Sequence, residues 1–344
     1  QIGAVLAKQL IAYCGSAEAV FKSKRRTLLK VPGIGPHLVD NIIKQDPYQL
    51  AVRELAFIEQ HQIQPLYFLD DAYPYRLRQV PDCPILLYYK GTADLNHSRI
   101  VSIVGTRKPS PRGQAICAEL VSELKQYGVL IISGLAYGVD ITAHRQCLIH
   151  DIPTVGVLGH GLARIYPASH RNIARQMIAQ GALLTEYTSD VEPKRAHFPM
   201  RNRIVAGLCD ALIVIETAKK GGSIITAELA NAYNKDVFAI PGRLSDAKSQ
   251  GCLHLIKTHR AALMESAKDI AYVMRWEKKE DTQEGQQQLF AALSTNEKSI
   301  IQLLKQTDYL GIDHLSAEMK MSTSDMAHLL LEMEFKGMIK TLPG

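Results

Sequence analysis

Several features that would assign this chain of 344 residues to a membrane, secreted or zinc-binding class are missing. No apolar run approaches the ~18–20 residues of a membrane-spanning helix, so we expect no membrane partner. The six cysteines include no Cys-x-x-Cys pair, which argues against structural zinc and fits reduced thiols. Reduced thiols are typical of a cytosol, so we expect a cytoplasmic protein, and the sequence shows no signal-peptide pattern.

Catalytic signatures are missing as well. The sequence has no Ser-His-Asp order, no nucleophile elbow, no Walker lysine and no metal-ligand cluster. Gly159-x-Gly161 begins a dinucleotide fingerprint, but Arg164 stands at the third glycine position and would crowd a bound pyrophosphate. We therefore expect a protein that is not an enzyme and that uses no cofactor and no metal ion.

Aromatic side chains are few, and the charge is unevenly distributed. The whole chain has one Trp and seven Phe. Residues 1–275 carry 33 Lys and Arg against 23 Asp and Glu, whereas residues 276–344 carry 7 against 11. The basic part suits a polyanionic partner. With few aromatic platforms, we expect it to contact a nucleic-acid backbone more than its bases.

Alternating strand and helix patterns mark the central part of the chain. Six apolar runs have the length and the β-branched content of buried strands, and helical patterns lie between them. This order predicts an α/β fold with one extended, Rossmann-like, doubly wound parallel sheet over residues 63–275. The runs are Arg99–Val104, Val129–Ile132, Pro153–Leu158, Ala182–Leu184, Ala211–Ile215 and Val237–Ile240.

Residues 1–62 read as short helices. Gly33-Ile34-Gly35 lies between apolar helix ends and resembles the turn of a helix-hairpin-helix or SAM-like domain. Ile2–Leu10 aligns weakly with Ile34–Ile42, as in a tandem pair of hairpins. Such a turn either points backbone amides at a nucleic-acid phosphate or serves packing alone, and both alternatives stay open.

The C-terminal part predicts a linker and a winged helix. Residues 276–288 are polar and of low complexity, hence a linker. Over residues 289–344, three amphipathic segments and the strand Gly337–Thr341 follow one another. The last helical segment, Ser324–Lys336, has three acidic residues and one cation, so we favour protein contact over DNA binding there. The helical segments are Glu297–Lys305, Ile312–Met319 and Ser324–Lys336.

The loops after the predicted strands carry the candidate ligand site, because ligands of an open α/β sheet bind beyond the carboxyl ends of its strands. Four such loops are rich in small residues, which let backbone amides approach phosphate, and three of them bear cations. Lys219–Ser223 opens a helix, and a helix N-terminus binds anions. We predict phosphate or DNA contacts from Gly105, Thr106, Arg107, Ser133, Gly134, Gly138, Gly159, Gly161, Arg164, Tyr166, Arg201, Asn202, Arg203, Lys220, Gly221, Gly222, Ser223 and Thr226.

Asp140 and His144 lie four residues apart on a predicted helix, which permits a hydrogen bond between them. An acid–base dyad is one interpretation. We favour the other, a structural role in holding the loop Ser133–Asp140.

Motifs across the central part resemble the DprA/Smf family of DNA-processing proteins. They follow the family's order over about residues 65–270, and only the last matches in part, since His254 departs from the usual pattern. The motifs are Val104–Arg107, Ser133–His144, Tyr166-Pro167, Phe198–Ile204, Gly222–Ala227, Ile240–Gly242 and Gly251–Ile256.

The resemblance implies a protein that binds single-stranded DNA in natural transformation and recombination. It implies a homodimer formed through the Rossmann-like domain, which loads RecA onto DNA otherwise covered by single-strand-binding protein. Arg107 would pair with a phosphate, the Gly159–Tyr166 loop would flank the strand, and Gly222 and Ser223 would supply amides. The chain departs from the family at Lys219–Gly221, where Ser-Gly is commoner, and at Ala163-Arg164, a possible place for a family lysine.

Two other hypotheses come from different classes. Gly221–Glu228 is also similar to the signature of nucleotide phosphoribohydrolases related to lysine-decarboxylase-like proteins, in which Glu228 would serve catalysis. Ile225 and Thr226 break that signature. The third hypothesis is a scaffold whose anion site no longer binds a ligand.

Overall fold

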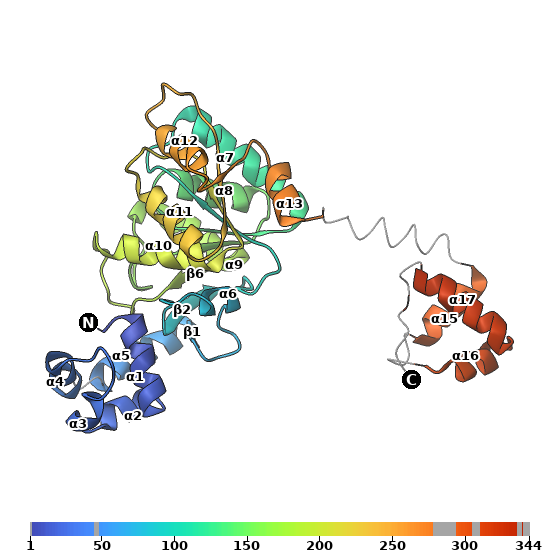
Figure 1. Cartoon of the computed structure of the whole chain (residues 1–344), viewed down its shortest axis with the longest axis horizontal. Helices are drawn as coiled ribbons and strands as arrows, with labels where there is room; N and C mark the ends of the chain where they lie inside the picture. The colour runs from blue at the N-terminus through green and yellow to red at the C-terminus, as the bar shows by residue number, and fades with distance from the viewer. Residues whose placement is uncertain (1, 45–47, 278–293, 305–309, 336–338, 340–344) are drawn as a thin grey trace. The chain divides into compact units, whose positions relative to one another are not determined.

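The structure is a computed structural model that describes residues 2–44, 48–277, 294–304, 310–335 and 339. The chain forms two compact units, residues 1–278 and 279–344 (Figure 1). The predicted boundary between residues 62 and 63 falls inside the first unit and stays a prediction. From residue 278 on, the predicted linker lies outside the described residues. Within the described ranges, no helix is both long and apolar enough to cross a membrane.

A nine-stranded sheet forms the centre of the first unit, in the order β1-β2-β6-β5-β4-β3-β7-β8-β9. The strands from β6 to β9 are parallel, and β1 and β2 add an antiparallel edge beside β6. The strands are β1 Gln64–Tyr67, β2 Leu86–Gly91, β3 Ile100–Val104, β4 Leu130–Ser133, β5 Thr154–Val157, β6 Ala182–Thr185, β7 Ala211–Val214, β8 Asp236–Ala239 and β9 Ala262–Leu263.

Helices cover both faces of this sheet, which confirms the predicted doubly wound fold (Figure 1). Strand β3 shows why, since all five of its residues are buried. Ile100 and Val104 pack into the cluster with α6, α10, α11 and α12. Val101 and Ile103 point to the other face and pack into the cluster with α7, α8 and α13.

The helices of the first unit that follow β1 are α6 Tyr75–Arg78, α7 Pro111–Leu124, η1 Lys125–Tyr127, α8 Val139–Ile149, η2 Ala168–His170, α9 Arg171–Gln180, α10 His197–Leu208, α11 Gly222–Ala232, α12 Gln250–Lys257 and α13 Ala267–Met274. All six predicted strands are present.

The antiparallel edge and β9 were not predicted. β2 pairs with β6 through Tyr88, Tyr89 and Lys90. Its run of Leu and Tyr residues is typical of a strand, but such a run does not indicate whether the strand pairs parallel or antiparallel. β9 has only two residues, too few to give a periodic pattern.

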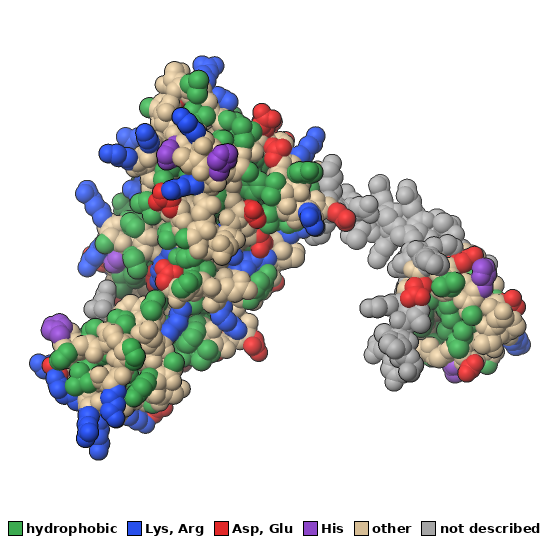
Figure 2. Space-filling model, viewed as in Figure 1, with side chains coloured by type: hydrophobic (Ala, Val, Ile, Leu, Met, Phe, Trp, Pro, Cys, Tyr) green, Lys and Arg blue, Asp and Glu red, His purple; other side chains and the backbone are tan. Residues whose placement is uncertain are grey.

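In the N-terminal part, α1 to α4 pack around one apolar cluster that includes Leu10, Leu28 and Ile42, whereas Ile58 of α5 packs against Tyr88 of β2. Gly33 has φ +77°, a conformation that favours glycine, in the turn between α3 and α4. Gly3 precedes α1 as Gly35 precedes α4, so both halves of the weak repeat begin a helix at the same place. Figure 2 shows Lys and Arg side chains gathered over this part. The helices are α1 Ala4–Cys14, α2 Ala17–Lys22, α3 Arg25–Leu28, α4 Pro36–Lys44 and α5 Tyr48–His61.

Polar contacts fix the N-terminal helices to the sheet-bearing part. The Glu54 carboxylate accepts hydrogen bonds from the backbone N–H of Ser189 at 2.9 Å and from its hydroxyl at 2.7 Å. Lys8 Nζ donates to the carbonyl of Pro81 at 3.0 Å. These contacts explain why both parts belong to one compact unit.

The second unit contains α15 Thr295–Leu304, α16 Ile312–Met319 and α17 Thr323–Phe335. Ile300, Leu315, Met326 and Met333 form its buried core. The three predicted helices are present. The predicted strand Gly337–Thr341 lies outside the described residues, apart from Ile339.

Candidate nucleic-acid interface

The chain reverses its direction of winding between β3 and β7. Strands β3, β4, β5 and β6 follow one another to one side, and β7 then returns to the other side of β3. In a doubly wound sheet, this switch point is where the two diverging loops leave a crevice for a ligand. The loops here are Gly105–Lys108 after β3 and Glu216–Gly221 after β7.

A cavity of about 340 Å³ lies at this switch point, and we call it the edge pocket. Nine of the predicted contact residues line it: Gly105, Thr106, Arg107, Arg201, Asn202, Gly221, Gly222, Ser223 and Thr226. Asp140, predicted as structural, lines it too, together with Val104, Ala136, Phe198, Thr217 and Ala218, which were not predicted.

The loop after β3 is held on both sides by backbone hydrogen bonds. The Thr106 N–H donates to the Glu216 carbonyl at 2.7 Å, and the Thr106 carbonyl accepts from Val139 N–H at 3.2 Å. Arg107 follows with an exposed side chain, whose guanidinium carbon lies 5.4 Å from the centroid of the Phe198 ring. The rigid loop thus presents a cation at the mouth of the edge pocket.

Arg201 lines the same pocket but serves the fold. Its side chain is buried, with the residue 4 % exposed, and Nη1 donates to the carbonyls of Gly134 and Val157. Burial lowers the pKa of Arg201 and raises the pKa of Asp140, and the charge of each partner opposes the effect on the other. A Cβ at Gly134 would lie 2.3 Å from Arg201 Nη1, so this close approach requires glycine. Arg201 therefore connects the loop after β4 with the carboxyl end of β5.

Arg203 is not brought to the pocket. Its side chain is 7 % exposed, pairs with the Glu186 carboxylate and donates to the carbonyl of Asp82. Successive residues of α10 point about 100° apart, so Arg201, Asn202 and Arg203 cannot all three face one ligand. Of the three, only Asn202 is half-exposed at the pocket.

The N-terminus of α11 forms another wall of the edge pocket. Gly221 is its N-cap, and no side chain caps the free backbone N–H groups there. The Ser223 hydroxyl is buried, lines the pocket and has no hydrogen-bond partner. A phosphate oxygen would satisfy the hydroxyl and the amides together. Lys219 and Lys220 are exposed, but neither lines the cavity.

A smaller depression of about 30 Å³ adjoins the edge pocket and shares Arg107, Ala136 and Phe198 with it. The predicted residues Gly134, Gly159 and Tyr166 line this depression. Tyr137 and Tyr166 are exposed there, and the Tyr166 ring centroid lies 6.1 Å from that of Phe198. The expectation of few aromatic platforms was therefore wrong, because three aromatic side chains from separate loops meet at one place.

Three other predicted contact residues have structural surroundings. The Ser133 hydroxyl is buried and donates to the Ile103 carbonyl at 2.6 Å. Gly138, with φ +85°, packs so closely that a Cβ would lie 2.2 Å from the Thr106 carbonyl oxygen. Gly161 packs against the carbonyls of Thr188 and Ser189. None of the three lines the edge pocket or the smaller depression.

Asp140 and His144 do not hydrogen-bond to each other. Asp140 Oδ2 accepts from the Ala136 N–H at 3.3 Å and so holds the loop after β4. His144 Nδ1 lies 2.8 Å from Thr154 Oγ1, and that hydroxyl donates to the Ile131 carbonyl, so Nδ1 carries the proton. Burial lowers the pKa of His144 to about 3, which keeps the ring neutral. Both surroundings favour a structural role.

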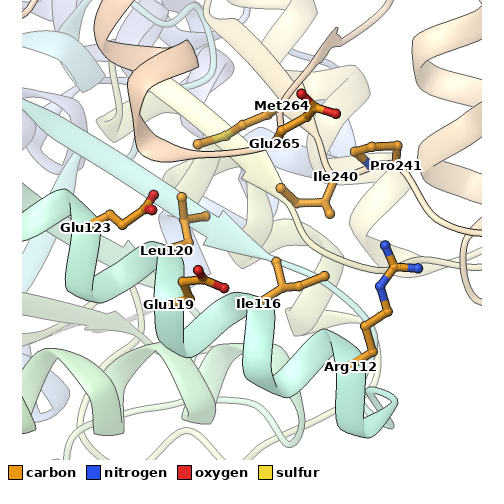
Figure 3. Close-up of a pocket in the computed structure, with 9 residues that line it drawn as sticks. All are labelled: Arg112, Ile116, Glu119, Leu120, Glu123, Ile240, Pro241, Met264 and Glu265. Atoms are coloured by element: carbon orange, nitrogen blue, oxygen red, sulfur yellow. The ribbon is translucent and has the colours of Figure 1, made fainter.

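Another cavity of the first unit has the opposite charge. It measures about 290 Å³, and Figure 3 shows Glu119 and Glu123 on α7, with Glu265 on the opposite side. Arg112 is its one cationic lining residue. Three carboxylates would repel phosphate, so this cavity is not a candidate for nucleic acid. In the described part of the chain, no group of three or more His, Cys, Asp or Glu side chains is placed to hold a metal ion.

Comparison with known proteins gives two family matches. The family model described as DNA recombination-mediator protein A matches residues 64–275, which include every residue of the edge pocket. The DprA winged helix domain matches residues 279–344, which confirms the predicted winged helix.

Two curated relatives are similar in sequence. Protein Smf of Synechocystis sp. is 38% identical over 266 residues, which are 74% of this chain and 65% of the relative. The match thus spans just under two thirds of that relative's length. DNA processing protein DprA of Streptococcus pneumoniae is 40% identical over 202 residues, 59% of this chain and 71% of the relative.

Two solved structures are similar in fold. The X-ray structure of DNA processing protein A from Streptococcus pneumoniae has a TM-score of 0.67 at 33% identity and covers 79% of this chain and 94% of its own. DNA processing protein A from Helicobacter pylori, described for its unique single-stranded DNA binding mode, has a TM-score of 0.57 at 30% identity. It covers 63% of this chain and 98% of its own.

Proposed function

This chain belongs to the family of DNA recombination-mediator protein A, and on that premise we propose that it binds single-stranded DNA in natural transformation and recombination. The observation that carries the proposal is the edge pocket. It combines the uncapped N-terminus of α11, the unpartnered Ser223 hydroxyl and the exposed Arg107. All three favour an anion, and a phosphodiester supplies one.

Single-stranded rather than duplex DNA fits the neighbouring depression. Phe198, Tyr137 and Tyr166 line it within reach of Arg107. A strand whose phosphate lies at Arg107 and α11 can place an unpaired base against these rings, whereas paired bases are not free to stack. Backbone contacts and stacking give little sequence preference.

The contacts themselves come from a smaller set than the sequence suggested. We propose Gly105, Thr106, Arg107, Asn202, Gly221, Gly222, Ser223 and Thr226 around the phosphate, and Gly159, Tyr166 and Phe198 beside the base. Arg201, Gly134, Asp140 and His144 support the loops. Lys220 acts at longer range, as an exposed charge outside the cavity.

Partners beyond DNA follow from family membership. We propose that the protein acts in the cytoplasm as a homodimer formed through the central domain. It loads RecA onto DNA otherwise covered by single-strand-binding protein. We propose the domain limits 1–62, 63–275 and 289–344, with a linker at 276–288.

We propose that the protein is not an enzyme and needs no cofactor. Glu228, the catalytic residue of the phosphoribohydrolase hypothesis, forms a surface ion pair with Arg260 at 3.1 Å and does not line the edge pocket. That geometry supports DNA binding over base release. Incubation with AMP should release no adenine, and release that is lost in Glu228→Gln would revive the enzyme hypothesis.

Equilibrium binding of a labelled dT oligonucleotide tests the proposed function. We expect binding to dT and to a mixed-sequence strand of equal length with similar affinity, and weaker binding to the same sequence as a duplex. Removal of Ser223's hydroxyl by Ser223→Ala should weaken binding without unfolding the protein. A preference for the duplex would contradict the proposal.

A further inference from the structure

A second cationic depression lies outside the edge pocket, and we call it the outer depression. It measures about 330 Å³ and is lined by Lys90 of β2, Arg164, and Arg171 and Arg175 of α9. Its apolar lining includes Ile178 and Leu183. Arg164 was predicted to contact DNA with the edge pocket residues, and the structure instead turns it to this depression.

Its cations are free to take a ligand. Among the residues that the structure describes, no hydrogen bond or ion pair engages the side chains of Lys90, Arg171 or Arg175. Arg164 pairs with Glu192 at 2.6 Å, but both side chains are substantially exposed, at 45% and 66%. Exposed pairs of this kind contribute little to stability, so a phosphate can replace Glu192.

The spacing on α9 suits a polyanion. Arg171 and Arg175 are four residues apart, one above the other on the helix, with about 6 Å of rise between them. Arg171 is the first residue of α9, whose first turn has no acidic side chain. The dipole of a helix disfavours a cation at this end, and a bound anion would offset that cost.

One loop connects this depression with the proposed DNA site. Gly159, His160 and Tyr166 line the small depression beside the edge pocket, and Leu162 to Ile165 line the outer depression. A strand that leaves the aromatic side chains across this loop therefore meets the cations of the outer depression. No aromatic side chain lines the outer depression, so contact there would be with the backbone and not with stacked bases.

We propose that the outer depression binds further phosphates of the same DNA strand that occupies the edge pocket. The inference rests on the proposed function and extends it, because it gives the strand a path and a minimum length. Nucleotides in the edge pocket are held by amides, Arg107 and aromatic rings. Those beyond the Gly159–Tyr166 loop are held by charge alone.

Oligonucleotide length separates the two sites. The test compares dT of about six nucleotides with dT of about 20, since single-strand sites span roughly 4–16 nucleotides per binding fold. The variant is Arg171→Glu with Arg175→Glu. The matched control is Lys125→Glu with Lys235→Glu. It reverses two charges just before β4 and β8, at the amino ends of the parallel strands and away from the loops of the proposed DNA site.

We expect the α9 variant to bind the short strand with affinity close to that of the control, and the long strand at least tenfold more weakly. Its salt slope for the long strand should fall by roughly 1.4, at about 0.7 per lost phosphate contact. Equal long-strand affinities of variant and control would overturn the proposal, as expected if the depression instead binds an acidic protein segment. Failure of the unmodified protein to bind either length would refute the proposed function itself.

Discussion

Arginines line both the edge pocket and the outer depression, but the two regions differ in how far these side chains are exposed to solvent. In the edge pocket, Arg201 is 4 % exposed and its guanidinium is engaged by two backbone carbonyls. In the outer depression, Arg171 and Arg175 are exposed. A buried arginine is part of the framework that shapes a site, whereas an exposed one can exchange water for a phosphate. Counting the cations near a loop in the sequence therefore overestimates the ligand contacts in the edge pocket. It also misses the exposed arginines of the outer depression.

The largest effect should come from Arg201→Ala, and it should be on stability. The change leaves two buried carbonyls without their donor and removes the charge that most lowers the pKa of the buried Asp140. Leaving each of these carbonyls without a partner costs about 1–3 kcal/mol. Urea unfolding should show this loss, with Arg107→Ala as the matched control that stays near the unmodified protein. Equal unfolding midpoints for the two variants would contradict the claim that Arg201 supports the fold and Arg107 does not.

Low pH should lower the stability of the protein through His144, which is buried like Arg201. Its pKa is lowered to about 3 in the folded protein, against about 6.5 in the unfolded chain. The neutral ring thus contributes stability above pH 6.5, and this contribution is lost as the pH falls towards 3. By pH 4 the free energy of unfolding should have fallen by about 3 kcal/mol from this group.

His144→Gln removes this titration, so its free energy of unfolding should fall less between pH 7 and pH 4 than that of the unmodified protein. Urea unfolding at several pH values measures the difference. Parallel pH profiles would mean that the pKa of His144 is the same in the folded and the unfolded protein, which would contradict the lowered value.

Arg107→Ala should lose DNA binding and keep the fold. Charge-assisted hydrogen bonds are worth about 1.5–3 kcal/mol, so affinity for a short dT strand should fall roughly 10- to 100-fold. Anisotropy titration measures it, with Lys125→Ala as the control for loss of one exposed charge. An unchanged affinity in Arg107→Ala would show that Arg107 does not contact the bound DNA.

The smallest effect is expected at Lys220, which is exposed beside the pocket without lining it. Lys220→Ala should weaken binding only a few-fold, about 1 kcal/mol or less, because a solvated charge acts through screened attraction. A loss as large as that of Arg107→Ala would show that Lys220 folds onto the bound strand.

The sequence predicted the sheet because its central strands are buried on both faces and read as continuous apolar runs, as in Ala211–Ile215. It also predicted the switch-point loops, since the carboxyl ends of parallel strands share one edge. Gly105–Arg107 and Gly221–Ser223 meet there, although their loops are more than 100 residues apart. Local pattern and the chemistry of small residues were sufficient for both.

The side-chain partners depend on contacts that no local pattern records. Arg201 bonds to carbonyls 67 and 44 positions away, and Arg203 pairs with Glu186 on a different element. The aromatic group was missed for the same reason, because Tyr137, Tyr166 and Phe198 come from three separate segments. Scarcity of aromatic residues in the whole chain says nothing about whether three of them converge.

The salt dependence of binding to a short dT strand tests most directly whether the edge pocket holds a DNA backbone. Each neutralised phosphate on a single strand contributes a slope of about −0.7 in log affinity against log salt, so three or four contacts should give roughly −2 to −3. Arg107→Ala should reduce the steepness by about 0.7. A flat response of the unmodified protein, or a slope that Arg107→Ala leaves unchanged, would contradict the account.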